Sequence, residues 1–581
     1  MRKTKIICTL GPSTDSIETM RSMILAGMNV ARFNFSHGTY EDHQTRLDML
    51  KSLREELNTP VAALMDTKGP EIRLKKFASG KEFLKAGQIF TLTTREVEGT
   101  SEIVSVTYKD LPHDLEIGST VLLADGLIRL TVENLTETDI TCRVMNDGPI
   151  SNNKGVNVPG VSLSLPYMSQ KDKEDIQFGI KAGFDFIAAS FARSARDIME
   201  IRHLLESEGC HNIRIIAKIE NREGVENIDE ILAVADGIMI ARGDMGVEID
   251  FTEIPIIQKD IIWHCFSAGK PVITATQMLE SMMENPRPTR AEITDVANAI
   301  YDGTSAIMLS GETAAGKFPV EAVRTMAAIA ERTESDSSYI EHMRKSPLDT
   351  RLSIAAATAH AACTTAADIK ATAIITVSKS GETARLLSKG RPETPIIACV
   401  LDEQTQRHLA LSWGVHPILM PYANSTDELV ELSVKTSVEH GLLQSGDLVV
   451  VTAGVPVGVS GTTNMIKVHM VGEFLASGVG IGNQNAKGAL CICRNTEEVA
   501  SKCKPGCVLV VPYTNNEMLP YMREANAVIV EEAGMNSHAA IAGLALGKAV
   551  IVGVANATRL LKDETMVSVD CVRGTIQTMP V

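Results

Sequence analysis

The chain has 581 residues and a mass of 62.7 kDa, more than one hydrophobic core can support, so three to five domains are expected. Its composition, with 22% charged and 44% apolar residues, is typical of a globular protein. The formal net charge of -16 argues against nucleic acid or an anionic membrane as the main partner, although a local pocket of Arg and Lys could still bind a small anion.

The cysteines and the N-terminal residues favour a cytoplasmic protein. The eleven cysteines are scattered and odd in number, as expected for reduced thiols. Cys491, Cys493, Cys503 and Cys507 lie nearest one another, but Cys-x-Cys with Cys-x3-Cys is not a usual zinc spacing, and no zinc site is predicted. The first eight residues lack a signal-peptide core, and no run of about 18 apolar residues predicts a membrane span.

Short apolar runs alternate with helical patterns through the first 345 residues. The expected strands are residues 5–11, 29–35, 61–68, 184–191, 213–221, 237–244, 271–277 and 304–311. The expected helices include residues 16–26, 41–56, 171–182, 195–208, 225–234 and 254–268. Eight strands that alternate with helices predict an α/β fold, a (β/α)8 TIM barrel.

The connection between the third and fourth strands, about residues 69–170, is too long for a single crossover. Alternating short strands at residues 89–94, 103–108, 120–123 and 128–133 predict a separate small β-barrel within it. Its insertion at the C-terminal face of the barrel would let it act as a lid. The barrel would comprise residues 1–69 and 171–345, and the lid domain residues 70–170.

Two further domains are expected. Residues 346–475 read as an α/β unit, with an Ala-rich helix at 354–367 and strands at 371–377, 395–400 and 448–453. The glycines at 478, 480, 482 and 488 predict a flexible stretch after it. Residues 476–581 are long enough for a C-terminal domain of their own.

Polar side chains follow the predicted barrel strands where each strand ends, which is the edge at which barrel enzymes carry their active sites. Lys218 and Glu220 stand two residues apart on the fifth strand and therefore share one of its faces. Burying such a pair costs desolvation energy. An isolated pair would fit a structural role, but similar groups recur at other strand ends. These are Arg32, Asn34, Ser36, His37, Asp66, Thr67, Glu71, Arg73, Arg242, Gly243, Asp244, Thr274, Thr276, Gln277, Ser310, Glu312 and Thr313.

This set suits a hard cation together with a phosphorylated substrate. The carboxylates of Glu220 and Asp244 are suitable magnesium ligands. Arg32 and Arg73 can each bind phosphoryl oxygens through two N–H groups. The lysine of the pair can neutralise charge on the oxygen between phosphorus and carbon. The backbone amides at Gly243 and Asp244, which open a helix, could bind a carboxylate.

Residues 1 to about 475 resemble pyruvate kinases of the bacterial type in motif order, spacing and the inserted lid. The matching segments are residues 31–38, 65–73, 215–221, 241–246, 275–282, 284–292 and 308–313. The resemblance implies transfer of the phosphoryl group of phosphoenolpyruvate to ADP in glycolysis, giving ATP, and then protonation of the enolate to pyruvate.

Three alternatives remain open. Another magnesium-dependent barrel enzyme acting on pyruvate or phosphoenolpyruvate, such as an aldolase, would need neither Arg73 nor the lid. A non-catalytic regulatory homologue predicts loss of a charged rim residue, and none is missing. A dikinase-like phosphohistidine enzyme would need an ATP-grasp domain, which the sequence does not show.

The resemblance also implies roles for individual residues. Glu220 and Asp244 would bind Mg2+ or Mn2+, and Lys218 would stabilise the transferring group and the enolate. Thr276 would bind the substrate carboxylate, close to the route by which a proton arrives through water. The remaining implied residues are Ser310 and Glu312 in that polar network, Asn34, Ser36, Asp66 and the Thr67 carbonyl for K+, Glu71 for potassium dependence, and Arg73, Lys154 and the 34–37 loop with His37 for ADP or ATP.

An effector site is implied in the α/β domain. Ser378, Lys379, Ser380, Gly381 and Thr383 follow a strand and open a helix, an arrangement that can cradle phosphate. Residues 452–464 would form the facing loop, and a plain helix cap is the alternative. Allosteric control by a phosphorylated effector normally accompanies a homotetramer in the pyruvate kinase family.

The C-terminal segment at residues 531–542 resembles the phosphohistidine swivelling domain of phosphoenolpyruvate-utilising enzymes. His538 falls on the phosphorylated position. Ala533 replaces the first glycine of the usual pair, and Leu544 stands where an arginine usually follows, which would remove a phosphate partner. These departures favour a structural or subunit-contact role.

Overall fold

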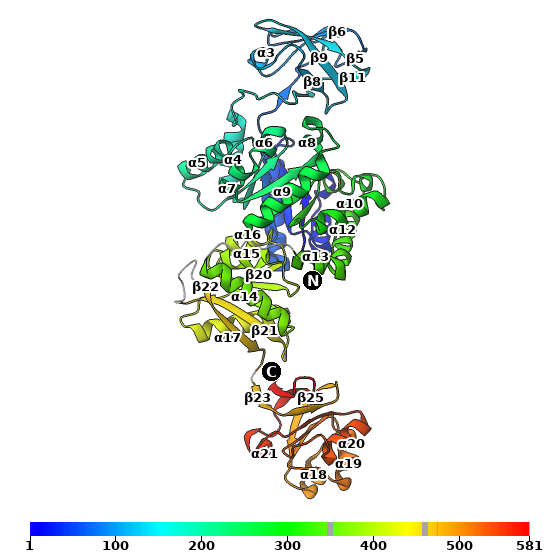
Figure 1. Ribbon diagram of the computed structural model, residues 1–581, viewed down its shortest axis with the longest axis vertical. Coiled ribbons are helices and arrows are strands. Elements are labelled where there is room, and N and C mark those ends of the chain that lie inside the picture. Colours follow the sequence, from blue (N-terminus) through cyan, green and yellow to red (C-terminus); the bar gives the residue numbers. More distant parts are fainter. Residues whose placement is uncertain (346–352, 456–462, 473, 580–581) are drawn as a thin grey trace. The chain divides into compact units, whose positions relative to one another are not determined.

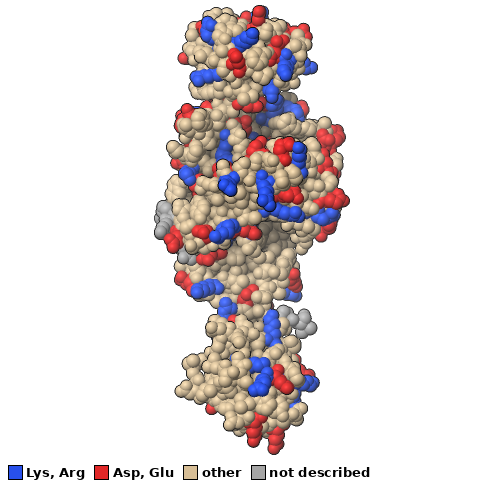
Figure 2. Space-filling view, turned by 90° about the vertical axis from the view of Figure 1, so that its right-hand side faces the viewer, with Lys and Arg blue, Asp and Glu red and all other residues tan. Residues whose placement is uncertain are grey.

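The computed structural model describes residues 1–345, 353–455, 463–472 and 474–579. It divides into two compact units, Met1–His360 with Ser378–Leu419, and Ala361–Val377 with Met420–Val581. Most of the predicted effector-facing loop, residues 456–462, lies outside the described residues. Among the described residues, no helix combines the length and apolar character needed to cross a membrane. Basic and acidic side chains are intermixed on the face seen in Figure 2.

The first unit contains the predicted closed barrel of eight parallel strands. In chain order these are β1 (Lys5–Thr9), β2 (Val30–Asn34), β3 (Ala62–Asp66), β13 (Phe186–Ala189), β14 (Arg214–Ile219), β15 (Gly237–Ala241), β16 (Val272–Ala275) and β17 (Ala306–Leu309). All eight expected strands are confirmed, and each is shorter than predicted. Most of the polar rim residues lie just beyond the last strand pairing.

Side-chain alternation along these strands decides which polar groups enter the barrel. Val30, Leu64 and Ile216 belong to the apolar cluster inside it, whereas Ile215 and Ala217 pack in the larger cluster beneath the helices. Two residues further along β2, β3 and β14, the same parity places Arg32, Asp66 and Lys218 on the inner face. The side-chain alternation that places apolar residues inside the barrel therefore also places these charged residues at its rim.

Helices cover the outside of the barrel (Figure 1). They are α1 (Ile17–Ala26), α2 (Tyr40–Leu57), α4 (Gln170–Ala182), α5 (Ala195–Ser207), α6 (Arg222–Glu226), α7 (Ile228–Val234), α8 (Arg242–Glu248), α9 (Ile254–Ala268), α10 (Arg290–Tyr301), α11 (Gly311–Ala314), α12 (Pro319–Glu334) and α13 (Ser337–Lys345). Capping boxes fix several starts, for example Ser169 with Asp172 at α4 and Thr289 with Glu292 at α10. The single helix predicted at residues 225–234 is wrong, because Asn227 ends α6 and α7 follows.

The inserted segment folds into a β-domain with its own core. Its strands are β4 (Ile72–Arg73), β5 (Lys81–Leu84), β6 (Ile89–Thr93), β7 (Ile103–Ser105), β8 (Thr120–Leu123), β9 (Ile128–Leu135), β10 (Asp139–Val144), β11 (Gly148–Ser151) and β12 (Gly155–Asn157), with one short helix, α3 (Leu111–Asp114). Seven strands form a sheet in the order β4-β12-β8-β9-β10-β6-β7. Its two edges meet through a bridge between Leu74 and Val106, as a small barrel requires.

The α/β region supplies elements to both units, each described by itself. In the first unit β19 (Ile396–Val400) pairs in parallel with β20 (Val415–Leu419), alongside α15 (Glu382–Lys389) and α16 (Glu403–Leu409). In the second, β18 (Ala373–Val377) pairs in parallel with β21 (Leu448–Gly454), and β22 (Thr463–Met470) runs antiparallel to β21. The helices α14 (Ile354–Asp368) and α17 (Thr426–Glu439) complete this region.

The C-terminal residues form an eight-stranded mixed sheet in the order β23-β30-β29-β25-β26-β27-β28-β24. Its strands are β23 (Phe474–Ser477), β24 (Val479–Ile481), β25 (Asn485–Ile492), β26 (Val508–Val511), β27 (Ala527–Val530), β28 (Ala549–Val552), β29 (Met566–Asp570) and β30 (Thr575–Thr578). Four helices accompany them, α18 (Thr496–Lys502), α19 (Leu519–Glu524), α20 (His538–Leu546) and α21 (Ala557–Leu560).

The flexible stretch predicted from its glycines is wrong. A Cβ on Gly480, within β24, would lie 1.7 Å from the carbonyl oxygen of Cys571, and one on Gly478 would lie 2.4 Å from that of Val552. Glycine is required there because two backbones approach closely, not because the chain needs freedom.

Candidate active site

Four charged side chains meet inside the mouth of the barrel. Lys218 Nζ lies 2.9 Å from Glu220 Oε1 and 3.1 Å from Asp66 Oδ1. Arg32 Nε donates to Asp66 Oδ2 at 2.6 Å. All four are buried, so their two positive and two negative charges compensate one another in a site with little water.

These contacts shift the titration of the buried groups. Burial opposes ionisation, yet the Arg32 and Lys218 cations hold the pKa of Asp66 below its usual value. Burial likewise opposes the charge on Lys218, but the carboxylates of Asp66 and Glu220 raise its pKa. Burial raises the pKa of Glu220 to about 7, against the lowering effect of Lys218. Lys218 is therefore held as a cation at the centre of the site.

Glu220 keeps one oxygen available for a ligand. Its Oε2 accepts the backbone N–H of Phe191 at 2.5 Å. Its Oε1 makes the ion pair with Lys218 but accepts no hydrogen bond among the described residues. Asp244, in the first turn of α8, is exposed and acts electrostatically on Glu220. The buried Glu220 Oε1 and the exposed Asp244 carboxylate are close enough to repel each other. Such a pair of oxygen ligands suits a divalent cation.

Thr276 has a backbone conformation that β-branched residues rarely adopt. Its φ is +67°, and Gln277 follows at +54°. Its Oγ1 accepts the N–H of Gly243 at 2.8 Å and donates to the carbonyl of Ala275 at 2.6 Å. Such strain persists where the surrounding structure enforces it, often at functional sites. The Gly243 amide, predicted to be open for a carboxylate, is thus occupied by Thr276.

Ser310 and Glu312 lie side by side at the end of β17. The Glu312 carboxylate is fully buried and accepts two backbone N–H groups, from Leu279 at 3.0 Å and Ser310 at 2.7 Å. Ser310 Oγ is buried and has no hydrogen-bond partner among the described residues. The carboxylate thus shapes the loop, and the hydroxyl is the group left available.

The residues expected to hold a monovalent cation lie around the end of β2. Asn34 Oδ1 accepts the N–H of Ser36 at 3.1 Å, and the carbonyl of Asn34 accepts the N–H of His37 at 3.2 Å. The Thr67 carbonyl lies 2.7 Å from Ser190 Oγ. Asp66 is shared with the central charge cluster.

Arg73 and the strand around Lys154 are brought together by the lid domain. Gly155 pairs with Arg73 in the β12–β4 ladder, and Leu74 N–H donates to the Lys154 carbonyl at 2.8 Å. The Arg73 guanidinium contacts Glu71 Oε2 at 2.8 Å and the Asn153 carbonyl at 2.9 Å. Arg73, in β4, and Lys154, just before β12, thus present positive charge from neighbouring segments of the lid domain.

Two residues of the central cluster were missed from the sequence. Ser190 Oγ accepts from Lys218 Nζ at 2.8 Å and lies 3.1 Å from Asp66 Oδ1, and Thr9 Oγ1 accepts from Arg32 Nη1 at 2.9 Å. Both follow or end barrel strands, β13 and β1, so reading every strand end would have found them. Arg242 was included among the rim groups, but its guanidinium binds the carbonyls of Ala275 and Thr276 and the carboxylate of Asp295.

Family models match three successive parts of the chain. A model described as pyruvate kinase, barrel domain, matches residues 1–323, and one described as pyruvate kinase, alpha/beta domain, matches residues 356–469. A third, described as PEP-utilising enzyme, mobile domain, matches residues 503–574.

The chain belongs to the pyruvate kinase family.

Full-length relatives agree with this assignment. A pyruvate kinase from Bacillus licheniformis is 49% identical over 99% of both chains, and one from Geobacillus stearothermophilus is 50% identical over 98% of this chain and 97% of its own. A crystal structure of a pyruvate kinase from Cryptosporidium parvum superposes with a TM-score of 0.75 at 39% identity, covering 81% of this chain and 96% of that one. The expected glycolytic phosphotransferase class is confirmed, and the aldolase-class alternative falls away.

The effector segment predicted for this pyruvate kinase lies between β18 and α15. Ser378 is buried, and its N–H donates to the Cys399 carbonyl at 3.1 Å. Gly381 has a φ of +76° and precedes α15, and the Ser380 carbonyl accepts from Arg385 Nη1 at 3.3 Å. Lys379 is exposed and Thr383 is buried in the first turn. The segment therefore forms the strand-to-helix turn that the sequence predicts.

His538 begins α20 in the C-terminal part of this pyruvate kinase. Its Nδ1 lies 2.8 Å from Thr514 Oγ1, and its Nε2 lies 3.1 Å from Asn516 Oδ1. Because the amide oxygen can only accept, the second contact places a proton on Nε2. Both ring nitrogens of His538 therefore contact polar side chains.

Proposed function

We propose that this pyruvate kinase transfers the phosphoryl group of phosphoenolpyruvate to ADP and then protonates the enolate to pyruvate. The observation that carries the proposal is the buried cluster of Arg32, Lys218, Asp66 and Glu220 in the barrel mouth. A cation fixed between two carboxylates cannot leave the site, so its charge is available where the phosphoryl group moves.

Positioning and electrostatics supply the catalysis in this scheme. Arg32 and Lys218 bind phosphoryl oxygens, and Arg73 reaches the transferring group from the lid. Lys218 then stabilises negative charge on the enolate oxygen as the phosphorus–oxygen bond breaks. Thr276, whose Oγ1 already accepts the Gly243 N–H, holds the substrate carboxylate together with the backbone amide of Asp244. These residues act without changing their own covalent state.

Glu220 and Asp244 would hold Mg2+ or Mn2+, and Glu220 Oε1, which faces Lys218 but accepts no hydrogen bond among the described residues, is suited to this role. When bound, the ion would lower the charge on phosphate and carboxylate oxygens. Asn34, Ser36, Asp66 and the Thr67 carbonyl would hold K+, with Glu71 as the acidic residue associated with potassium dependence. All of these donors are oxygen atoms, the type that hard cations prefer.

The enolate must then receive a proton on carbon. We assign its delivery to water held by Thr276 and Ser310, because Ser310 Oγ is buried and without a partner among the described residues. Glu312 orients this loop through two backbone N–H groups and so acts as a positioning residue. ADP would bind at Arg73, Lys154 and the loop containing His37, coupling nucleotide binding to lid movement.

The remaining assignments concern regulation and assembly. We propose a cytoplasmic homotetramer with barrel residues 1–69 and 171–345, lid residues 70–170, effector domain residues 346–475 and C-terminal residues 476–581. A phosphorylated effector would bind Ser378, Lys379, Ser380, Gly381 and Thr383. His538 is assigned a structural role. Digestion after incubation with labelled phosphoenolpyruvate checks this, since a phosphorylated peptide containing His538 would contradict it.

Pyruvate formation tests the central proposal. Pyruvate and ATP should appear in equal amounts only when phosphoenolpyruvate and ADP are both present, and removal of divalent cation should stop the reaction. Replacing K+ by Na+ should lower the rate. Pyruvate release without ADP, or binding of phosphoenolpyruvate without turnover, would contradict the proposal.

A further inference from the structure

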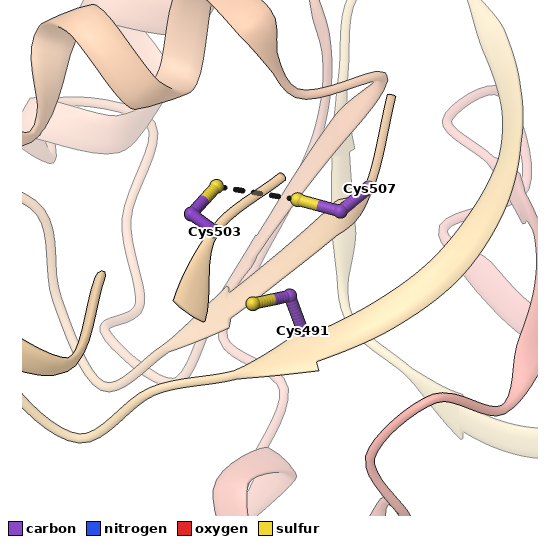
Figure 3. A group of neighbouring side chains, drawn as sticks. All are labelled: Cys491, Cys503 and Cys507. Carbon is purple, nitrogen blue, oxygen red and sulfur yellow. Dashed lines mark hydrogen bonds between the residues drawn. The ribbon is translucent and has the colours of Figure 1, made fainter. Parts of the chain in front are cut away.

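Four cysteines of the C-terminal sheet gather on one side of it. The sulfur atoms of Cys491, Cys503 and Cys507 all lie within 4.8 Å of one another (Figure 3). Cys503 Sγ and Cys507 Sγ are 3.3 Å apart, and Cys493 Sγ lies 3.8 Å from Cys491 Sγ. None of these residues has a role in the proposed reaction.

Two separate segments supply these thiols. Cys491 lies in β25 and Cys493 just beyond it, two residues apart and therefore on the same face. Cys503 ends α18, and Cys507 precedes β26, which pairs in parallel with β25. The turn between them contains Pro505 and Gly506, whose φ of +82° reverses the chain. The N–H of Cys507 donates to the Lys504 carbonyl at 3.2 Å, which fixes the turn.

The distances suit a tetrahedral metal site better than a disulfide. Sulfur atoms in a disulfide are about 2.05 Å apart, well below the 3.3 Å found here. Four thiolates around zinc at about 2.3 Å from the metal place their sulfur atoms about 3.8 Å from each other. The Cys491–Cys493 separation has this value, and the Cys503–Cys507 separation of 3.3 Å lies nearer to it than to a disulfide bond.

The surroundings also suit a thiolate site that a metal can enter. Cys493 is fully buried and Cys491 and Cys507 are each 7% exposed, whereas Cys503 is half-buried. Cys503 thus provides an opening to solvent. Lys502 and Lys504 flank Cys503 and are exposed, so they offset the negative charge of metal-bound thiolates.

We propose that Cys491, Cys503 and Cys507, with Cys493 as fourth ligand, bind one thiophilic divalent cation, zinc. Binding forms a metal–sulfur bond at each thiol and releases one proton from each, with no change of oxidation state. The metal joins the end of β25 to the turn before β26. It therefore stabilises the C-terminal part of the chain without acting in catalysis.

Metal content of the full-length protein is the primary test. Protein purified without chelator should carry about one zinc per chain. After removal of the metal with a chelator, Co2+ should bind with the same stoichiometry and give the thiolate-to-cobalt charge-transfer absorption of a tetrahedral site. The thermal unfolding midpoint of the C-terminal part should fall on metal removal and recover on adding Zn2+.

Serine variants locate the ligands. Cys491→Ser, Cys503→Ser and Cys507→Ser should each lose the cobalt–thiolate absorption and weaken zinc binding at least about tenfold. Cys493→Ser, which replaces the fourth sulfur by oxygen, should likewise weaken zinc binding and lower the absorption. Cys571→Ser is the matched control: Cys571 is buried in the same sheet but contacts the Val550 carbonyl, so metal binding should be unchanged.

The Cys503→Ser variant should disturb folding least, because the Cys503 side chain is only half-buried at the end of α18. Its loss of cobalt absorption, with unchanged circular dichroism, supports the site. Absence of zinc and of the cobalt–thiolate absorption in the unaltered protein, with these thiols reactive toward Ellman's reagent, would overturn it. A Cys503–Cys507 disulfide in freshly purified protein would overturn it equally.

Discussion

Lys218 and Asp66 form a buried ion pair across the barrel mouth, although they stand 152 positions apart in the chain. Their strands, β14 and β3, both pair with β13, so the two side chains meet over the end of the strand between them. Ser190, just beyond that strand, accepts from Lys218. Lys218, Asp66 and Ser190 are therefore brought together by three neighbouring barrel strands. The position of the Lys218 charge depends on all three.

Replacing Lys218 by Met should remove the cation while keeping much of the side-chain length. The turnover number should fall by about 10²–10³-fold or more, because stabilisation of the enolate charge is lost. Steady-state pyruvate formation at saturating substrates measures this. Lys259→Met is a matched control, since Lys259 pairs with Asp302 outside the cluster. Near-normal turnover in Lys218→Met would refute the mechanism.

Ser190→Ala tests the positioning of Lys218. It removes a hydroxyl within hydrogen-bond distance of Lys218, Asp66 and the Thr67 carbonyl. A loss of about 1.5 kcal/mol corresponds to a roughly tenfold lower turnover number. The KM for ADP should change little, since the serine hydroxyl contacts Lys218, Asp66 and Thr67 rather than Arg73 or Lys154. Ser207→Ala, at the exposed end of α5, should behave like the unaltered enzyme.

Glu312→Gln separates a positioning role from proton donation. The variant keeps one carbonyl oxygen but turns an amide N–H toward a backbone N–H, either of Ser310 or of Leu279. A buried donor left unsatisfied costs about 1–3 kcal/mol, which should lower the denaturant midpoint. Glu321→Gln, exposed in the first turn of α12, should leave the midpoint unchanged. Lost activity at unaltered stability would instead favour direct proton transfer by Glu312.

His408 should make stability fall in acid. Burial lowers its pKa to about 4, with Asp185 opposing, and its ring packs edge-on against Phe186. In the unfolded chain the ring takes up a proton near pH 6.5. Stability is therefore present above about pH 6.5 and is lost as pH falls toward 4, by up to about tenfold in the folding equilibrium constant per pH unit.

His408→Gln should reduce this acid sensitivity relative to the unaltered protein. Other groups titrate in both proteins, so the difference between their unfolding midpoints at pH 4.5 and 6.5 isolates His408. His211→Gln, at an exposed position, serves as the control. Parallel pH profiles for all three proteins would show that His408 is not responsible.

Gly480→Ala should strongly destabilise the C-terminal sheet. Its new methyl group would meet the Cys571 carbonyl oxygen at 1.7 Å, so the β24 backbone would have to move. We expect a cost above about 3 kcal/mol, read as loss of protease resistance in the C-terminal residues. Gly482→Ala provides a graded comparison. No atom lies within 4 Å of a Cβ added at Gly482, so the alanine should cost only the about 1–2 kcal/mol of a left-handed backbone at φ +85°. Equal protease resistance of the two variants would contradict the close approach.

The barrel and most of its polar rim follow from local patterns of residues along the chain. Alternation along a strand is a local property, so Ile216, Lys218 and Glu220 had to share a face wherever the strand lay. Motif spacing then carried the family resemblance. The same reasoning failed at Gly478 and Gly480, because glycine that permits close backbone approach and glycine that permits flexibility are indistinguishable in sequence.

Which groups far apart in the chain come into contact depends on the packing of the folded protein. Ser190 links Lys218 to Asp66 through its hydroxyl. The Glu312 carboxylate accepts two backbone N–H groups. The spacing of these residues in the sequence predicts neither set of contacts. The cysteines show this most clearly. Their spacing argued against zinc, yet parallel pairing of β25 with β26 brings Cys491 to Cys503 and Cys507. Pairing between strands sets such distances, and its partners are chosen by the packing of the whole sheet.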